Sequence, residues 1–212
     1  MDGQNREGKK IMAEQLTFKV FDMYDISQIQ VKDPALRPFI NLNQKLLLKS
    51  QGRRKDKLAM TRVNVVERLA NRLAVPGHSG RKHKIITNWS SGKYNRNMKT
   101  VMQALALVEK KTGKNPVQVL IEAIENGSPR DEITVIESAG ARYPQAVDCS
   151  PMRRINLAIR WMVQGSYQKC FGKKAKMSES LANEIISASK GAMESYACSK
   201  RNESEKQADS AR

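Results

Sequence analysis

The stretch from Ser128 to Arg160 restricts the possible folds more than any other part of the chain. Its first half contains two short, partly apolar segments separated by a small residue and Gly140. This pattern is typical of a β-hairpin with a glycine turn. Pro151 follows at once, and proline is favoured at the first position of a helix, where its missing N–H is not needed. The sequence therefore predicts a hairpin over residues 131–149 that leads directly into a helix.

Helical spacing of apolar residues dominates the rest of the chain. The spacing that marks one buried helix face recurs before and after the hairpin. The expected helices cover residues 63–75, 98–112 and 116–127 before the hairpin, and begin at 151, 179 and 196 after it. We therefore expect a mostly α fold, a helical bundle of about six helices with a protruding β-hairpin between helices three and four. Residues 1–62 are interpreted as an N-terminal extension and basic arm, and residues 63–212 as the helical domain.

The charge of the chain favours a polyanionic partner. It has 38 lysines and arginines against 21 aspartates and glutamates, a formal net charge of +17. Such an excess suits a nucleic acid or, less often, an anionic membrane surface. No acid occurs between Arg68 and Val108, or from Cys149 to Ser178, whereas an ordinary solvated surface mixes both signs. Because the excess is this large in a chain with only 5% aromatic residues, nucleic acid is the favoured partner. No apolar run approaches membrane-spanning length.

Cations in several regions are candidates for nucleic-acid contacts. In the helix that begins at 151, a wheel of 100° per residue places Arg153 and Arg160 opposite the apolar face and Arg154 on a flank. We expect these arginines, with Gln164, to face away from the core. The other candidates lie in the basic arm (Arg53, Arg54, Lys55), in an acid-free loop (Arg81, Lys82, Lys84) and in the loop before the fifth helix (Lys173, Lys174, Lys176). Flexible basic segments of this kind typically become ordered on RNA.

The sequence offers little for catalysis or metal binding. It has two histidines and three widely spaced cysteines, with no CxxC pair, P-loop or GxSxG element. No metal, cofactor or disulfide framework is expected, and the cysteine usage favours a reducing compartment. Two alternatives remain open. One is an RNA-acting enzyme that uses Asp131, Glu132 or a cysteine, and the other is a basic DNA-binding helical protein whose Arg153 and Arg154 enter a groove.

Four separate motifs occur in an order that resembles a known family. They are NVVERLANRL at residues 64–73, KTGKNPVQVLIEAIENGSPRDE at 111–132, QAVDCSPMRRINLAIRWMVQGS at 145–166 and LANEIISASKG at 181–191. Together they resemble the universal small-subunit ribosomal protein seven family, whose eukaryotic members are called protein five. The segment VKDPALRPFINL at 31–42 is similar to the archaeal branch, so the resemblance extends over residues 31–212.

The resemblance implies a structural role in the small ribosomal subunit and no enzymatic activity. It implies binding to the 3′ major domain of small-subunit rRNA, nucleation of head assembly, and a cytoplasmic place beside exit-site tRNA and the mRNA exit channel. The implied neighbours are head and platform ribosomal proteins, including number eleven. Neither a membrane partner nor a homo-oligomer is expected. Arg153 and Arg154 resemble the paired arginines that open the family's fourth helix, and Lys99 resembles the basic start of its second.

The tip of the hairpin departs from the family pattern. The family commonly has arginines and paired glycines there. This chain has one glycine and one acid in its tip, which consists of Glu137, Ser138, Ala139, Gly140 and Ala141. The single arginine of the region, Arg142, lies on the return strand. We therefore expect the tip to act as a steric obstacle beside the RNA path. Most of the affinity for RNA should come from other parts of the chain.

Overall fold

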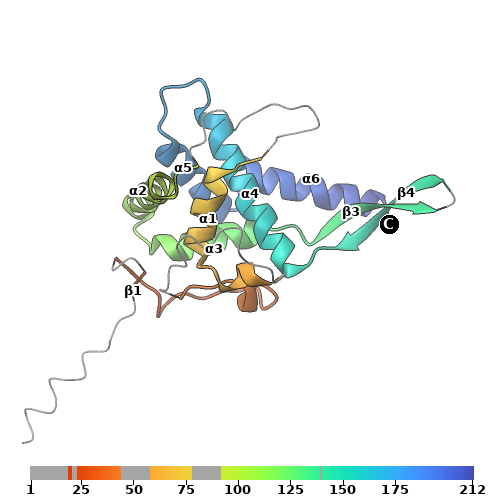
Figure 1. Cartoon of the computed structure of the whole chain (residues 1–212), viewed down its shortest axis with the longest axis horizontal. Coiled ribbons are helices and arrows are strands. Elements are labelled where there is room, and N and C mark those ends of the chain that lie inside the picture. The colour runs from red at the N-terminus through yellow and green to blue at the C-terminus, as the bar shows by residue number, and fades with distance from the viewer. Residues whose placement is uncertain (1–18, 21–22, 44–57, 78–91, 139) are drawn as a thin grey trace, which may run out of the picture.

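The structure is a computed structural model that describes residues 19–20, 23–43, 58–77, 92–138 and 140–212. Its helices are α1 (Val65–Ala74), α2 (Tyr94–Thr112), α3 (Pro116–Gly127), α4 (Pro151–Cys170), α5 (Met177–Ser189) and α6 (Tyr196–Ser210). Two antiparallel sheets pair β1 (Lys19–Val20) with β2 (Tyr24–Asp25) and β3 (Asp131–Ser138) with β4 (Ala141–Asp148), and short 3₁₀ turns cover Arg37–Phe39 and Ala59–Arg62. The expected mostly helical fold, with a hairpin between α3 and α4, is confirmed (Figure 1).

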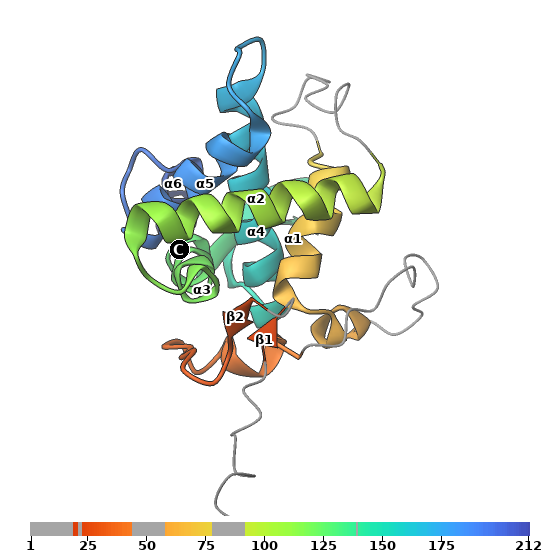
Figure 2. The ribbon, with the colours of Figure 1, turned by 90° about the vertical axis from the view of Figure 1, so that its left-hand side faces the viewer.

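Helix α5 lies at the centre of the helical core. It packs against α2, α3 and α4, and α1 packs against both α2 and α4. Figure 2 shows α2 crossing in front of the other helices. One face of α3 is an apolar stripe that consists of Val117, Leu120, Ile121 and Ile124. All four side chains are fully buried. Leu36 and Ile40 of the N-terminal segment belong to the same core, and the division of the chain after residue 62 stays a prediction.

Three helices begin at residues other than those expected. Helix α1 begins at 65 instead of 63, because the Asn64 side chain accepts a hydrogen bond from the Val66 N–H and so caps the helix. Helix α5 begins at 177 instead of 179, since two N–H groups of its first turn donate to the Lys176 carbonyl. Helix α2 begins at 94 instead of 98, so the polar residues 94–97 form its first turn.

The hairpin projects from the helical core (Figure 1). Its strands pair from Asp131 with Asp148 at the base to Ser138 with Ala141 at the tip, which confirms the expected hairpin. Gly140 in the turn has a φ of 81°. This is a left-handed conformation that glycine adopts without a Cβ clash, so the glycine read from the sequence is the residue that the turn requires.

The polar helix α6 is held in place by the base of the hairpin. The Glu205 carboxylate accepts a hydrogen bond from the Arg130 N–H at 3.0 Å, and the Ser204 hydroxyl donates to the Asp131 carbonyl at 3.3 Å. Arg212, after the end of the helix, pairs with the Asp131 carboxylate. These contacts brace the base from which the hairpin projects.

Gly165 allows α6 to approach α4 closely. A Cβ there would lie 2.5 Å from the Cβ of Tyr196 and 3.2 Å from the carboxyl carbon of Glu184, a buried acid that pairs with Lys169. At an open helical site, replacing glycine with alanine stabilises by up to about 1 kcal/mol. Here we expect Gly165→Ala to lower the free energy of unfolding by about 1–3 kcal/mol, because the added methyl overpacks the contact.

Urea unfolding measures this change. Gly92→Ala is the matched control, since a Cβ at Gly92 would meet nothing within 4 Å, and its effect should stay within about 0.5 kcal/mol. If Gly165→Ala had the same free energy of unfolding as the unaltered chain, α4 and α6 would be able to move apart without loss of stability.

Candidate nucleic-acid interface

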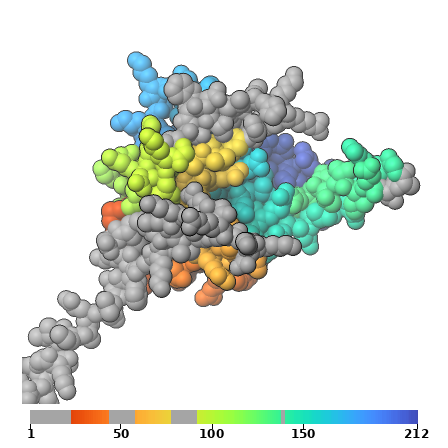
Figure 3. All heavy atoms as spheres, in the orientation of Figure 1, coloured from red at the N-terminus to blue at the C-terminus, as the bar shows by residue number. Residues whose placement is uncertain are grey.

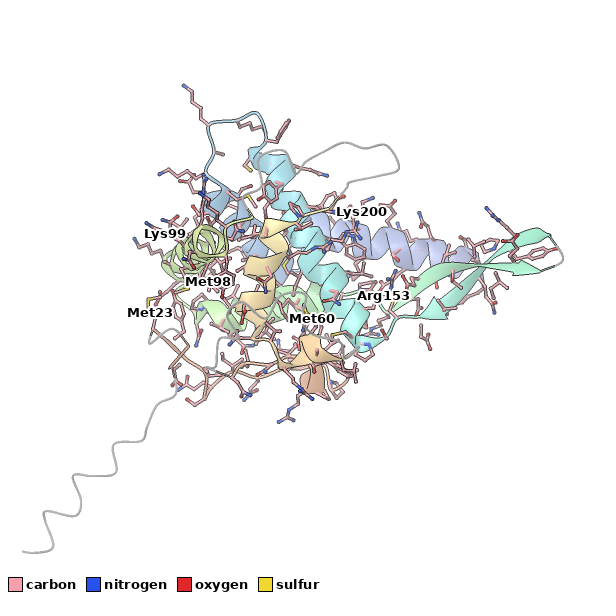
Figure 4. All side chains as sticks on the ribbon, viewed as in Figure 1. Met23, Met60, Met98, Lys99, Arg153 and Lys200 are labelled. Atoms are coloured by element: carbon pink, nitrogen blue, oxygen red, sulfur yellow. The ribbon has the colours of Figure 1, made fainter. Side chains whose placement is uncertain are left out.

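A groove of about 510 Å³ opens between α1, α4 and the 3₁₀ turn at Ala59–Arg62. Figure 3 shows α1 and α4 side by side on this face of the molecule. Figure 4 labels two of the lining residues, Met60 from the turn and Arg153 from the start of α4. Four arginines line the groove, namely Arg68, Arg72, Arg153 and Arg160, and no carboxylate is among the described residues that line it. The groove is therefore a concentration of one-signed charge.

Helical geometry explains why these four arginines meet. Arg68 and Arg72 are four residues apart on α1, so their side chains share one face of that helix. Arg153 and Arg160 are seven residues apart on α4, which again places them on one side two turns apart. Packing of α1 against α4 then brings the two arginine faces together. The positive charges of neighbouring arginines repel one another, and a bound anion would reduce this repulsion.

Arg68 is a buried cation with an incomplete set of hydrogen bonds. It is 3% exposed, and its guanidinium donates to the Phe39 carbonyl at 3.2 Å and to the Asn156 side-chain oxygen at 2.9 Å. Its Nε has no hydrogen-bond partner among the described residues. Burial lowers the pKa of Arg68 to about 10. Buried charges are normally paired, but Arg68 forms no salt bridge with any of the residues that the structure describes.

Arg72 and Arg160 both lie close to Gly77. A Cβ at Gly77 would lie 3.5 Å from a terminal guanidinium nitrogen of each arginine, and its φ of 82° also disfavours a side chain. Burial and the nearby charge of Arg160 both lower the pKa of Arg72. The buried Nε of Arg72 also has no hydrogen-bond partner within the described part of the chain. The wall of the groove therefore contains two buried guanidinium nitrogens that have no hydrogen-bond partner among the described residues.

Arg153 faces away from the core, as expected, but is already paired. Its guanidinium makes two contacts with the carboxylate of Glu132 on β3, at 2.5 and 2.6 Å. This hydrogen-bonded pair raises the pKa of Arg153, although burial works weakly against it. Any phosphate that binds Arg153 must share it with Glu132, so its role in RNA binding stays a prediction.

The expectation that Arg154 and Gln164 face away from the core is wrong. Arg154 is 8% exposed and donates to the Asp33 carboxylate at 2.7 Å and to the Ser128 hydroxyl at 3.3 Å. Gln164 is buried and donates to the Pro76 carbonyl at 3.1 Å. The helical wheel misplaced both because segments from other parts of the chain cover the flanks of α4. Arg154 therefore connects α4 to Asp33 and Ser128 inside the protein.

The remaining candidate residues are scattered. Arg53, Arg54, Lys55, Arg81, Lys82, Lys84 and Ala139 lie outside the described residues. Lys99 is exposed on α2, and Lys173, Lys174 and Lys176 are exposed between α4 and α5. Figure 4 shows Lys99 well apart from Arg153. At the hairpin tip, exposed Arg142 pairs with Glu137 at 3.5 Å, next to exposed Gly140 and half-buried Ala141, while Ser138 ends β3. The structure therefore gathers only Arg153 and Arg160 of the candidates into the groove.

Sequence reasoning missed Arg68 and Arg72. Each looked like an ordinary cation on the polar side of an amphipathic helix. The available signal was their spacing of four residues at the start of a long stretch without acids. That signal indicates a positive helix face, but it does not reveal which other helix meets that face.

The groups available for catalysis are occupied or unreactive. Glu132 pairs with Arg153, and Asp131 pairs with Arg212. Burial, followed by the charge of Glu132, raises the pKa of the Cys149 thiol to about 11, so it is not a ready nucleophile. Within the described ranges, no group of three histidines, cysteines or acids could hold a metal ion, and no helix is both long and apolar enough to span a membrane.

Comparison with known proteins gives consistent matches. A family model described as ribosomal protein S7p/S5e matches residues 41–212. A relative from Nanoarchaeum equitans, named small ribosomal subunit protein uS7, is 43% identical over 198 residues, covering 93% of this chain and 100% of that protein. Proteins of the same name from Picrophilus torridus and Methanococcus vannielii are 42% identical over 194 residues and 37% identical over 202 residues, covering 91% and 94% of this chain and 98% of each relative.

Proposed function

The chain belongs to the ribosomal protein S7p/S5e family, and from this premise we propose how it acts in the ribosome. Its role is structural. The relatives described above are archaeal proteins that are named as parts of the small ribosomal subunit. We propose that it binds small-subunit rRNA, and that the arginine groove between α1 and α4 is a principal contact with the phosphate backbone. The observation that carries this proposal is the groove itself, which is lined by four arginines and by no carboxylate among its described lining residues.

The chemistry of the groove fits a phosphate group. A guanidinium presents several N–H donors in a planar fork that matches phosphate oxygens. One phosphate in the groove would accept hydrogen bonds from the terminal guanidinium nitrogens of Arg72 and Arg160, which both lie near Gly77, and would offset the repulsion between the two arginines. Folded RNA offers many phosphates at irregular angles, and such contacts supply most of the affinity of a protein with a net charge of +17.

The two alternatives lose the residues on which they relied. A helix that reads a DNA groove needs exposed side chains at its start, yet Arg154 is buried and Arg153 is paired with Glu132. An RNA-acting enzyme would need Asp131, Glu132 or a thiol, and the two acids are held in ion pairs. Neither alternative is supported by a free reactive group among these residues.

We further propose the finer location implied by the family. The chain would bind the 3′ major domain of the rRNA, nucleate head assembly in the cytoplasm, and lie beside exit-site tRNA, the mRNA exit channel and protein number eleven. The hairpin supports this because it projects beyond the helices (Figure 1) and carries exposed apolar residues, including Val135 and Tyr143, with few cations. Such a surface suits a steric obstacle better than a phosphate clamp.

Chemical footprinting of small-subunit rRNA with and without the chain tests the proposal. We expect protections confined to the 3′ major domain, and an affinity that falls steeply as salt rises. Binding to duplex DNA of equal length at matched salt is the comparison. Equal affinity for both nucleic acids, or protections spread evenly over the rRNA, would contradict rRNA recognition. A variant lacking residues 137–142 should give the same protections but disturb tRNA at the exit site, and failed assembly would instead make the hairpin a scaffold.

A further inference from the structure

A second cavity, of about 500 Å³, lies between the start of α2, the end of α4 and the loop that follows α4. We propose that this cavity binds an unstacked base of the rRNA, which stacks on Phe171 while its flanking phosphates contact the surrounding cations. The cavity shares no lining residue with the arginine groove. The inference rests on the proposed rRNA binding and adds a base-binding site to the phosphate contacts.

The inner wall of the cavity is apolar and fixed in place. The Tyr167 hydroxyl donates to the Leu73 carbonyl at 3.1 Å, which holds the phenol ring against the end of α1. Burial raises the pKa of Tyr167 to about 12, so the ring stays neutral. The Cys170 and Met177 sulfur atoms lie 3.5 Å apart, which joins the end of α4 to the start of α5. A flat aromatic base fits such a wall, and the volume is within the range of small-ligand sites.

Phe171 supplies an exposed aromatic ring at the mouth of the cavity. It follows the last residue of α4, and 56% of its surface is exposed. More than half of this residue is therefore accessible to a ligand. Unpaired bases of RNA stack on such rings, and this stacking tolerates any base because each has a π-face.

The charge around the cavity selects a polyanion. All of its lining residues come from the two stretches of sequence that contain no acid, 69–107 and 149–178. Exposed Arg96 lines the cavity on the α2 side. Three exposed lysines, Lys173, Lys174 and Lys176, are adjacent in sequence to the lining residues Gly172, Ala175 and Met177. None of these four cations forms a salt bridge within the described part of the chain. A cavity with an apolar inner wall and exposed cations at and next to its lining residues matches a base with phosphates on both sides.

The first test compares rRNA binding by the full chain and its Phe171→Leu variant. Leucine keeps apolar bulk but cannot stack as an aromatic ring does. We expect affinity for a 3′ major domain fragment to fall roughly 5- to 150-fold, the equivalent of one base–aromatic stack. The dependence of affinity on salt should stay the same, because Phe171 contacts no phosphate. Lys174→Gln should instead lower the salt slope by about 0.7–0.9.

Met193→Leu is the matched control, since Met193 is a similarly exposed apolar residue outside the cavity. The affinity of the Met193→Leu variant for the rRNA fragment should equal that of the unaltered chain. In the unaltered complex, ultraviolet irradiation should crosslink RNA to the peptide containing Phe171, and Phe171→Leu should remove that crosslink. Unchanged affinity of Phe171→Leu would overturn the inference. A cavity that is filled by a protein partner instead of a base would give this result. Failure of the unaltered chain to bind rRNA is a different result, which would refute the proposed function itself.

Discussion

Replacing Arg154 with methionine should lower the free energy of unfolding by about 3–5 kcal/mol without lowering the affinity of the folded chain for rRNA. The Arg154 side chain is 10% exposed, and it donates to Asp33 at 2.7 Å and to Ser128 at 3.3 Å. Methionine fills similar space but leaves the partly buried Asp33 carboxylate, whose side chain is 23% exposed, without its charged partner. Urea unfolding measures the loss, and rRNA titration checks the affinity. A large loss of affinity in the folded variant would restore Arg154 as an RNA contact.

The same pair makes the stability depend on pH in a defined direction. Burial alone would raise the pKa of Asp33, but hydrogen bonds from Arg154 and the Ala35 N–H, with the charges of Arg154 and Arg130, outweigh it and hold the pKa below 3.8. A carboxylate with a lowered folded pKa stabilises the protein above its unfolded pKa. That contribution disappears as the pH falls through the folded pKa.

The difference in stability between the unaltered chain and Arg154→Met should therefore be full at pH 7 and shrink below about pH 4. Asp33→Asn provides the matched control, because it removes the titrating group and keeps the shape. In the Asp33→Asn background, the effect of Arg154→Met should no longer change with pH over this range. A pH-independent difference in the Asp33 background would show that the pair contributes through packing and not through charge.

Local signals in the sequence accounted for the hairpin and for several helix ends. Asn115 accepts a hydrogen bond from the Val117 N–H at the start of α3, and Gly113 ends α2 with a φ of 65°. Gly140 likewise takes the left-handed conformation in the hairpin turn. Caps and left-handed turns require particular residue types within a few positions. A sequence therefore displays them directly.

Contacts between remote segments were not available to the same reasoning. Arg154 and Asp33 are 121 positions apart, and Gln164 and Pro76 are 88 apart. A helical wheel counts only the apolar residues of its own helix, so it assigned both polar residues of α4 to solvent. The same limit applies to the positions of the cations. Charge density identified the exposed lysines after α4, whereas the arginine groove exists only because α1 packs against α4.

The largest expected effect on binding comes from replacing both Arg72 and Arg160 with glutamine. Each charged hydrogen bond to a phosphate is worth about 1.5–3 kcal/mol, so the double variant should bind rRNA at least about 100-fold more weakly. Loss of the one phosphate that both arginines contact should also lower the salt slope by about 0.7–0.9. Titrations of rRNA at several salt concentrations measure both quantities.

Stability should change in the opposite direction. The pKa of Arg72 is lowered by burial and by the charge of Arg160, which means that its charge opposes folding at neutral pH. Removing both charges should therefore leave the chain as stable as before or more stable. Reduced binding with undiminished stability would mark these arginines as retained for an anion and not for the fold.

A control with the same loss of net charge separates the groove from general electrostatics. Arg37→Gln with Lys206→Gln removes two exposed cations that do not line the groove. General attraction to RNA falls equally in the two double variants, so any further loss in Arg72→Gln with Arg160→Gln belongs to the groove. If both variants lost affinity equally, the groove would contribute no specific phosphate contact, and the unpartnered nitrogens of Arg68 and Arg72 would need another explanation.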